Sequence, residues 1–334
     1  MNLKQLPKIE LHCHLDGSVR PETIIELAKI ENIKLPSYDI ESIKNILVAP
    51  MECSSLNEYL EKFEIPVAIM QSKENLKRIA YELMEDSAKE NIKYIEIRFA
   101  PLLHTNKGLS SEDIIQSVLE GITEGEKNYN IKGNLILSFL RHMPVETIYD
   151  VIEVGRKYLG NGVVAIDLCA NEEKGFSEKF VNPFSLGKKY GYKVTIHAGE
   201  TGIGENVLDA VQLLGAERIG HGIHIKNCKE AYDIVKEKNI FLEMCPTSNV
   251  QTKAVDSFNI HPIFNFHKDG IKVTINTDNR TVSNTTLSNE YNIIKNNFDI
   301  DLDIYKNIYL NSVDAAFTDS QTKEMLKNLL KNVD

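Results

Sequence analysis

The sequence predicts an α/β fold of the TIM (β/α)8 barrel type, with a helical insertion after the first strand and further helices at the C-terminal end. Three observations support this prediction: eight short apolar runs, helical patterns between them, and histidines and carboxylates at the ends of several runs. Apolar strands that alternate with helices are typical of a parallel sheet covered on its outer face. In a closed parallel barrel the functional side chains stand where the strands end.

The eight apolar runs are expected to be the barrel strands. Each run is short and nearly continuous in apolar residues, as a strand buried on both faces should be. We expect them at about residues 8–12, 93–99, 134–140, 163–168, 193–197, 218–221, 240–244 and 272–276. Their number matches the fold, because the barrel closes with eight strands.

Helical patterns fill the intervals between the strands. Pro21 stands at the permitted first position of "PETIIELAKI", and either Ser110 or Ser111 can cap "SSEDIIQSVLEGITEGEKNY". The second strand begins only after about 80 residues, which is far more than one connecting helix needs. We therefore expect one domain spanning 1–334, with a helical insertion at about 20–90 that caps the barrel and closing helices from about Thr286 onward.

Part of the insertion has residues at helical spacing, in the segment "SSLNEYLEKFEIP". These are Leu56, Tyr59, Leu60 and Phe63. Packing of an amphipathic helix explains most positions of this kind. However, a segment that leaves the carboxyl end of the first strand lies above the active site, so some of the four could cover a pocket.

Composition and charge limit the possible partners. The 334 residues are 42% hydrophobic and 26% charged, which is ordinary for a soluble globular protein. The net charge, 38 − 48 = −10, comes from interspersed residues without a basic stripe, so we expect no nucleic-acid partner. No apolar stretch reaches the roughly 18 residues that span a bilayer, and "MNLKQLPKIE" lacks the apolar core of a signal peptide. We expect no membrane partner and a cytoplasmic protein with five reduced cysteines.

Histidines and one aspartate at four strand ends indicate a metal centre. Side chains alternate along a strand, so His12 and His14 point the same way while Cys13 points to the other side. A lone buried histidine is most often structural, but here His197, His221 and Asp278 follow three further strands. Three imidazoles and one carboxylate are a typical zinc set. We therefore expect the side chains at these strand ends to share one metal ion.

We assign His12, His14, His197 and Asp278 as the ligands, which leaves Glu200 and His221 for proton transfer. Spacing alone does not separate a ligand from a base, so a ligand role for His221 stays open. The fourth strand and its exit, "VVAIDLCANE", contain no lysine. Two-metal barrels of this design typically bridge their ions with a carboxylated lysine, so the sequence favours a single ion.

Five motifs, "PKIELHCHLDGSVRPETI", "HAGE", "ERIGHGIH", "LEMCPTSNVQT" and "NTDN", resemble those of the adenosine deaminase family. The resemblance runs from about residue 6 to residue 285, and all motifs occur in the family order. It implies one zinc ion per chain on the four ligands named above. It also implies that Glu200 donates a proton to the purine ring and that His221 orients and deprotonates the attacking water. The implied substrate-binding residues are His14, Asp16 at the ribose 5′-hydroxyl, Ala170 and Asn279.

The implied activity is hydrolytic deamination of adenosine and 2′-deoxyadenosine to inosine, 2′-deoxyinosine and ammonia, in purine salvage. Two residues depart from the family pattern. Asn279 stands where many members have an aspartate that presents a proton to purine N7, and an amide can donate there without being protonated. Ala170 stands where a glycine often offers its N–H to purine N3, and its methyl group is expected to crowd the base.

Other functions are open at this point. Deaminases of adenine or of modified adenosines share the zinc residues, but Leu-Asp-Gly around Asp16, in place of Ile-Glu-Gly, favours a nucleoside. A barrel hydrolase for an ester or cyclic amide would give the Glu200 acid no ring nitrogen to protonate. A binding protein with structural zinc would not need an acid and a base. The nucleic-acid deaminase signature is absent, and the oligomeric state is not determined by the sequence.

Overall fold

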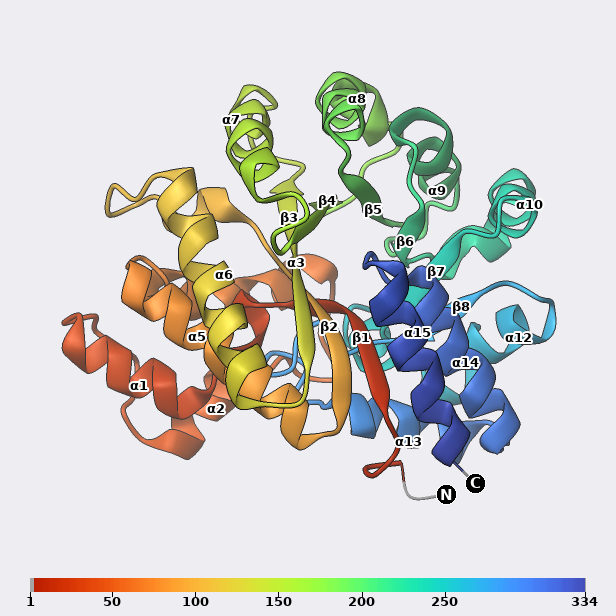
Figure 1. The fold of residues 1–334 in the computed structure, drawn as a ribbon, viewed down its shortest axis with the longest axis horizontal. Helices are drawn as coiled ribbons and strands as arrows, with labels where there is room; N and C mark the ends of the chain where they lie inside the picture. Colours follow the sequence, from red (N-terminus) through yellow and green to blue (C-terminus); the bar gives the residue numbers. More distant parts are fainter. Residues whose placement is uncertain (1–2, 334) are drawn as a thin grey trace.

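The computed structural model describes residues 3–333 and contains one eight-stranded parallel sheet in the order β1 to β8 (Figure 1). Each strand pairs in parallel with the next, from β1 with β2 to β7 with β8. The strands are β1 Lys8–His14, β2 Ile92–Phe99, β3 Lys132–Leu140, β4 Val163–Cys169, β5 Lys193–Ala198, β6 Arg218–His221, β7 Phe241–Met244 and β8 Val273–Ile275. The predicted TIM barrel is confirmed.

The barrel closes just beyond the end of β8. The Asp278 N–H donates to the His12 carbonyl at 2.8 Å, and the His14 N–H donates to the Asp278 carbonyl at 2.7 Å. Most strands have bounds that differ from the predicted ones by one or two residues. Strand β1 continues through His14 because the exit of β8 pairs with it, whereas β8 itself ends at Ile275.

Five α-helices lie between β1 and β2, where the sequence predicts the insertion. They are α1 Pro21–Ile30, α2 Ile40–Leu47, α3 Leu56–Leu60, α4 Glu64–Ile69 and α5 Lys73–Lys89, with short 3-10 turns η1 Asp16–Ser18 and η2 Glu61–Phe63. Pro21 begins α1, as expected. Helix α5 packs beside α6 Ser111–Asn128, which Ser110 caps in a capping box with Asp113.

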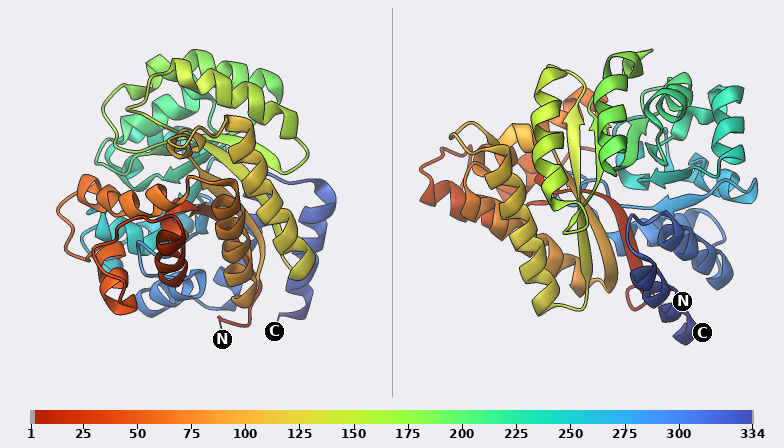
Figure 2. Two further views of the ribbon diagram at one scale, coloured as in Figure 1. Left: turned by 90° about the vertical axis from the view of Figure 1, so that its left-hand side faces the viewer. Right: turned by 45° about the horizontal axis from the view of Figure 1, so that its top comes forward.

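The remaining helices cover the outside of the barrel and its C-terminal side (Figure 2). The α-helices are α7 Glu146–Gly155, α8 Val181–Tyr190, α9 Glu205–Asp209, α10 Lys229–Glu237, α11 Pro246–Gln251, α12 Ile263–Lys268, α13 Leu287–Asn297, α14 Leu302–Ala315 and α15 Ser320–Leu329. The shorter turns are η3 Pro101–His104, η4 Arg156–Tyr158, η5 Phe176–Phe180, π-helical η6 Ala210–Leu214, η7 Ile223–Asn227, η8 Phe258–Ile260 and η9 Leu330–Asn332. Thr286 caps α13, and α14 packs against β1 and β8. No helix of the described residues is long and apolar enough to cross a membrane.

The barrel interior contains a buried ionic network where many barrels stack apolar layers. Glu243 of β7 accepts from Arg98 at 2.7 Å and from Arg218 at 2.6 Å. Arg218 also contacts Glu96 at 2.6 Å. These side chains are almost completely buried, so each charge needs the partners that surround it. The network fixes Glu243 directly below the strand ends that carry the histidines.

Candidate active site

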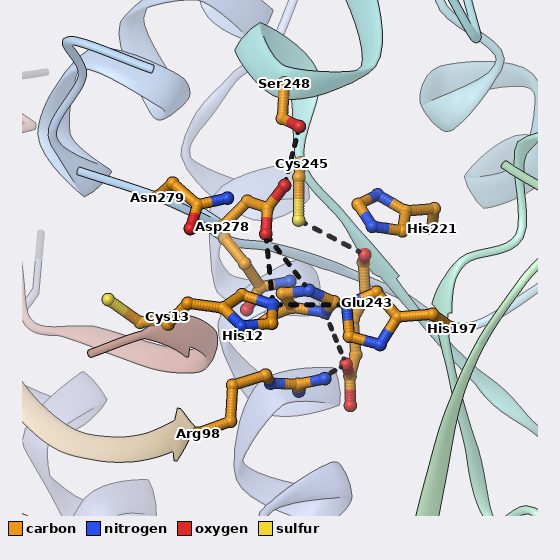
Figure 3. Close-up of polar contacts among 12 residues, drawn as sticks. His12, Cys13, Arg98, His197, His221, Glu243, Cys245, Ser248, Asp278 and Asn279 are labelled. Atoms are coloured by element: carbon orange, nitrogen blue, oxygen red, sulfur yellow. Dashed lines mark hydrogen bonds and ion pairs between the residues drawn. The ribbon is translucent and has the colours of Figure 1, made fainter. Parts of the chain in front are cut away.

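Five of the predicted residues meet at the carboxyl ends of the strands, and Figure 3 shows His12, His197, His221 and Asp278 among them. Ligand atoms of His12, His197, His221 and Asp278 all lie within 4.8 Å of one another. The His14 Nε2 atom lies 3.2 Å from Nε2 of His197 and 3.4 Å from Oδ1 of Asp278. Cys13 is turned away, as strand alternation predicts, and its sulfur lies 3.5 Å from the Ser18 hydroxyl.

Two histidines are oriented by carboxylates behind them. The Nδ1 atom of His12 donates to Glu243 at 2.7 Å, and Nδ1 of His197 donates to Asp167 at 2.9 Å. Both rings therefore turn an unprotonated Nε2 toward the cluster, and Nε2 of His12 is buried without a hydrogen-bond partner. A carboxylate behind the imidazole is typical of metal-ligating histidines. The donor set therefore fits a divalent metal ion.

His221 has different partners from the other two rings. The Asn249 amide N–H donates to Nδ1 of His221 at 2.9 Å. The amide is held in this orientation because its oxygen accepts from the Cys245 N–H at 3.3 Å and from His261 at 3.2 Å. Neutral His221 then carries its hydrogen on Nε2, which faces Glu200 at 3.7 Å. This contact pattern favours a role other than metal ligand.

Glu200 lies in the turn that follows β5, with its side chain buried in the site. Gly199 has a φ of 70°, and this backbone conformation makes the sharp turn possible. The Oε1 atom of Glu200 has no hydrogen-bond partner. Burial raises the pKa of Glu200, while the neighbouring His221 opposes the shift. The carboxyl group therefore keeps its proton at a higher pH than an exposed glutamate does.

Glu172 is a site residue that the sequence does not reveal. Its buried carboxylate accepts the N–H groups of Gly199 at 2.9 Å and Glu200 at 2.8 Å, and the side-chain amide of Asn206 at 2.9 Å. It thereby fixes the turn that carries Glu200. In the sequence it is one of 48 acidic residues, and only its place shortly after a strand end distinguishes it.

Three site residues have left-handed backbones: Ala170 with φ 72°, His221 with φ 64° and Asp278 with φ 62°. Elsewhere among residues 3–333 this region is occupied, apart from glycines, by asparagines and Lys253. Such conformations cost on the order of 1–3 kcal/mol and gather at functional sites. At Ala170 the backbone has a conformation that glycine adopts without this cost.

A cavity of about 180 Å³ lies over the cluster. Leu56, Tyr59, Leu60 and Phe63 line it from α3 and η2, and we call these four residues the cover. No lysine or arginine is among the lining residues. They are His14, Asp16, Leu56, Tyr59, Leu60, Phe63, Ala100, Leu103, Ser138, Leu140, Cys169, Ala170, His197, Glu200, His221, Asp278 and Asn279.

Asp16, in η1 just after β1, is an acidic residue of the cavity wall. Its side chain is buried, and Oδ1 has no hydrogen-bond partner. Burial raises its pKa to about 6, against the backbone N–H groups that stabilise the carboxylate. Oδ1 of Asp16 is therefore an acceptor without a partner at the wall of the cavity. A larger, open hollow of about 750 Å³ at the amino-terminal ends of the strands contains none of the site residues.

A parallel barrel with a histidine and aspartate cluster beside a buried carboxylic acid defines a class, the metal-dependent hydrolases of the (β/α)8 type. A family model described as adenosine deaminase matches residues 7–333. The adenosine deaminase of Clostridium botulinum (strain Okra / Type B1) is 59% identical over 333 residues, 100% of this chain and 99% of that protein. The chain belongs to the adenosine deaminase family. It is an aminohydrolase that deaminates adenosine.

Solved structures with other specificities share the fold. The adenine deaminase of Arthrobacter aurescens has a TM-score of 0.91 at 24% identity, covering 98% of each chain. The N6-mAMP deaminase of Arabidopsis has a TM-score of 0.88 at 26% identity, covering 99% of each chain. The fold thus accommodates more than one purine substrate, and the residues of the cavity must explain the choice among them.

Proposed function

We propose that the chain holds one zinc ion on His12, His14, His197 and Asp278 and uses it to deaminate adenosine and 2′-deoxyadenosine. The observation that carries this proposal is the convergence of these nitrogen and oxygen donors beside the buried Glu200. Three imidazoles and a carboxylate suit zinc better than a hard cation such as magnesium. When bound, zinc lowers the pKa of a coordinated water to about 7 and supplies a nucleophile at neutral pH.

Glu200 neutralises the negative charge that develops on the purine. As hydroxide adds to C6 of adenosine, electrons move onto N1, and a protonated Glu200 donates its proton there. The ring then does not accumulate a full negative charge. The proton of the new hydroxyl group then passes to the amino group, which leaves as ammonia, and inosine keeps the proton on N1. Burial supports this role because it raises the pKa of Glu200 and favours the protonated acid.

His221 orients the attacking water. Its Nε2 carries a hydrogen when the ring is neutral, because Asn249 donates to Nδ1. The nucleophile that bound zinc makes available is a hydroxide that has already lost its proton, and the hydrogen on Nε2 can bind one lone pair of that hydroxide and leave another for C6 of the purine. Accepting a proton from the water at the same nitrogen would require the Asn249 amide to turn and accept from Nδ1.

The cavity favours a nucleoside over a nucleotide. Asp16 offers the unpartnered Oδ1 of its carboxylate to the 5′-hydroxyl, whereas a 5′-phosphate would bring negative charge toward it with no lining lysine or arginine to compensate. The Asn279 amide and the Ala170 backbone N–H serve as donors to N7 and N3 of the base. None of these residues is assigned to the 2′-hydroxyl, and we therefore include 2′-deoxyadenosine.

A substrate comparison tests this proposal. We expect kcat/KM for adenosine and 2′-deoxyadenosine to agree within about tenfold, and to exceed those for adenine and AMP by at least about a hundredfold. The measurement is the ultraviolet change on deamination, with ammonia release as a second readout. A kcat/KM for AMP equal to that for adenosine would contradict the role of Asp16.

A further inference from the structure

A tyrosine of the cover reaches the residue that we assign to the purine base. Tyr59 lies in α3, yet its hydroxyl accepts the side-chain N–H of Asn279 at 2.9 Å, across 220 positions of the sequence. The same hydroxyl lies 2.6 Å from Oγ of Ser283. Tyr59 and Asn279 are each only 2% exposed, so no bulk water replaces these contacts.

The donor and the acceptor in each of these hydrogen bonds can be assigned. A neutral tyrosine has one hydrogen, and burial raises the pKa of Tyr59 well above its ordinary value, so the hydroxyl stays neutral. Because the oxygen accepts from Asn279, the single hydrogen is free to go to Ser283. One of the two N–H groups of the Asn279 amide donates to Tyr59, and the other remains available as a donor.

The oxygen of the same amide is turned toward the backbone of the first βα loop. A Cβ atom placed on Gly17 would lie only 1.8 Å from Oδ1 of Asn279, so the oxygen packs against the bare Cα of the glycine. That oxygen has no hydrogen-bond partner. With its oxygen at Gly17 and one N–H on Tyr59, the amide cannot rotate freely. Asn279 lines the cavity, and its remaining N–H is the donor left for a bound molecule.

We propose that Tyr59 is a positioning residue for purine recognition, whose hydroxyl holds the Asn279 amide so that its second N–H meets an acceptor nitrogen of the base. The inference rests on the proposed contact between Asn279 and N7. It adds a coupling between the cover and that contact, because Tyr59 belongs to α3 and also packs in a small apolar cluster with Ala49, Cys53 and Val282. Displacing α3 therefore releases the amide.

The test compares binding of inosine and 7-deazainosine, which differ in the acceptor nitrogen at position 7 and are not turned over. We expect the wild-type chain to bind inosine about threefold to tenfold more tightly, the range of one hydrogen bond. Tyr59→Phe keeps the ring and its packing but loses the hydroxyl. In this variant we expect the ratio of the two dissociation constants to fall close to one.

Two further variants separate positioning from packing. Leu103→Ala alters the apolar lining of the cavity from η3, outside the cluster that contains Tyr59, so it should shift both dissociation constants together and keep the ratio. In Asn279→Ala the ratio of the two dissociation constants should fall close to one, and adding Tyr59→Phe to this variant should cause no further change. A Tyr59→Phe protein that weakens both ligands equally, or neither, overturns the inference. Equal binding of the two ligands by the wild type also overturns it, whereas absent adenosine turnover would contradict the proposed function.

Discussion

At the scale of single residues, several residues of the site have energetically unfavourable backbone conformations or buried polar groups. His221 and Asp278 have left-handed backbones, and Glu200 is a buried carboxyl with an unpartnered oxygen. A stable fold keeps such residues only where the surroundings hold them. Ser248 shows how, because its hydroxyl donates to Oδ2 of Asp278 at 2.6 Å and leaves Oδ1 for the cluster.

Glu200→Gln tests the proton donor. Glutamine has nearly the same shape but cannot donate a proton to N1, so we expect kcat to fall at least about a hundredfold. Glu200 is not among the proposed ligands, and the zinc content should stay the same. Near-normal turnover, measured by the ultraviolet change from adenosine to inosine, would contradict the assignment.

His221→Ala tests whether this ring is a ligand. The hydrogen that Asn249 places on Nε2 excludes a free lone pair there, so we expect the variant to retain about one zinc ion per chain while turnover falls steeply. The matched control is His197→Ala, which removes a proposed ligand and should lose the metal. Metal analysis by mass spectrometry decides between them, and loss of zinc from His221→Ala would place His221 in the ligand set.

At the scale of elements, the ends of β1, β5, β6 and β8 deliver the proposed ligands, acid and water-orienting group, and α3 covers them. The sequence predicted these strand ends because the period of two and the short apolar runs are local signals. It did not predict Glu172, Asn249 or the Tyr59 contact with Asn279. Their partners lie tens to hundreds of positions away, and no local pattern reports such pairing.

Glu172→Gln tests how the turn after β5 is held. A glutamine can accept with only one atom and would direct its own N–H groups at the donors of Gly199 and Glu200. We expect unchanged zinc content, a loss of about 1–3 kcal/mol in the free energy of unfolding, and a kcat about tenfold to a hundredfold lower. The control is Glu173→Gln, an exposed neighbour. Equal kcat values for the two variants would remove the positioning role.

At the scale of the whole molecule, the barrel interior contains buried charged side chains where many barrels have apolar layers. Glu243 connects His12 at the site to Arg98 and Arg218 deeper in the barrel. The sequence predicted the barrel correctly from its strands and helices but gave no sign of this network, since an Arg or Glu within an apolar run does not show which strand supplies its partner. We propose that the chain works as one domain whose stability and activity both depend on the metal.

The most direct test of the account follows zinc occupancy and deamination together. The purified chain is assayed for adenosine conversion before chelation, after removal of metal, and after zinc is returned in measured amounts. We expect one zinc ion per chain, loss of nearly all turnover in the metal-free protein, and recovery in proportion to occupancy up to one equivalent. Undiminished turnover by the fully metal-free chain would contradict it.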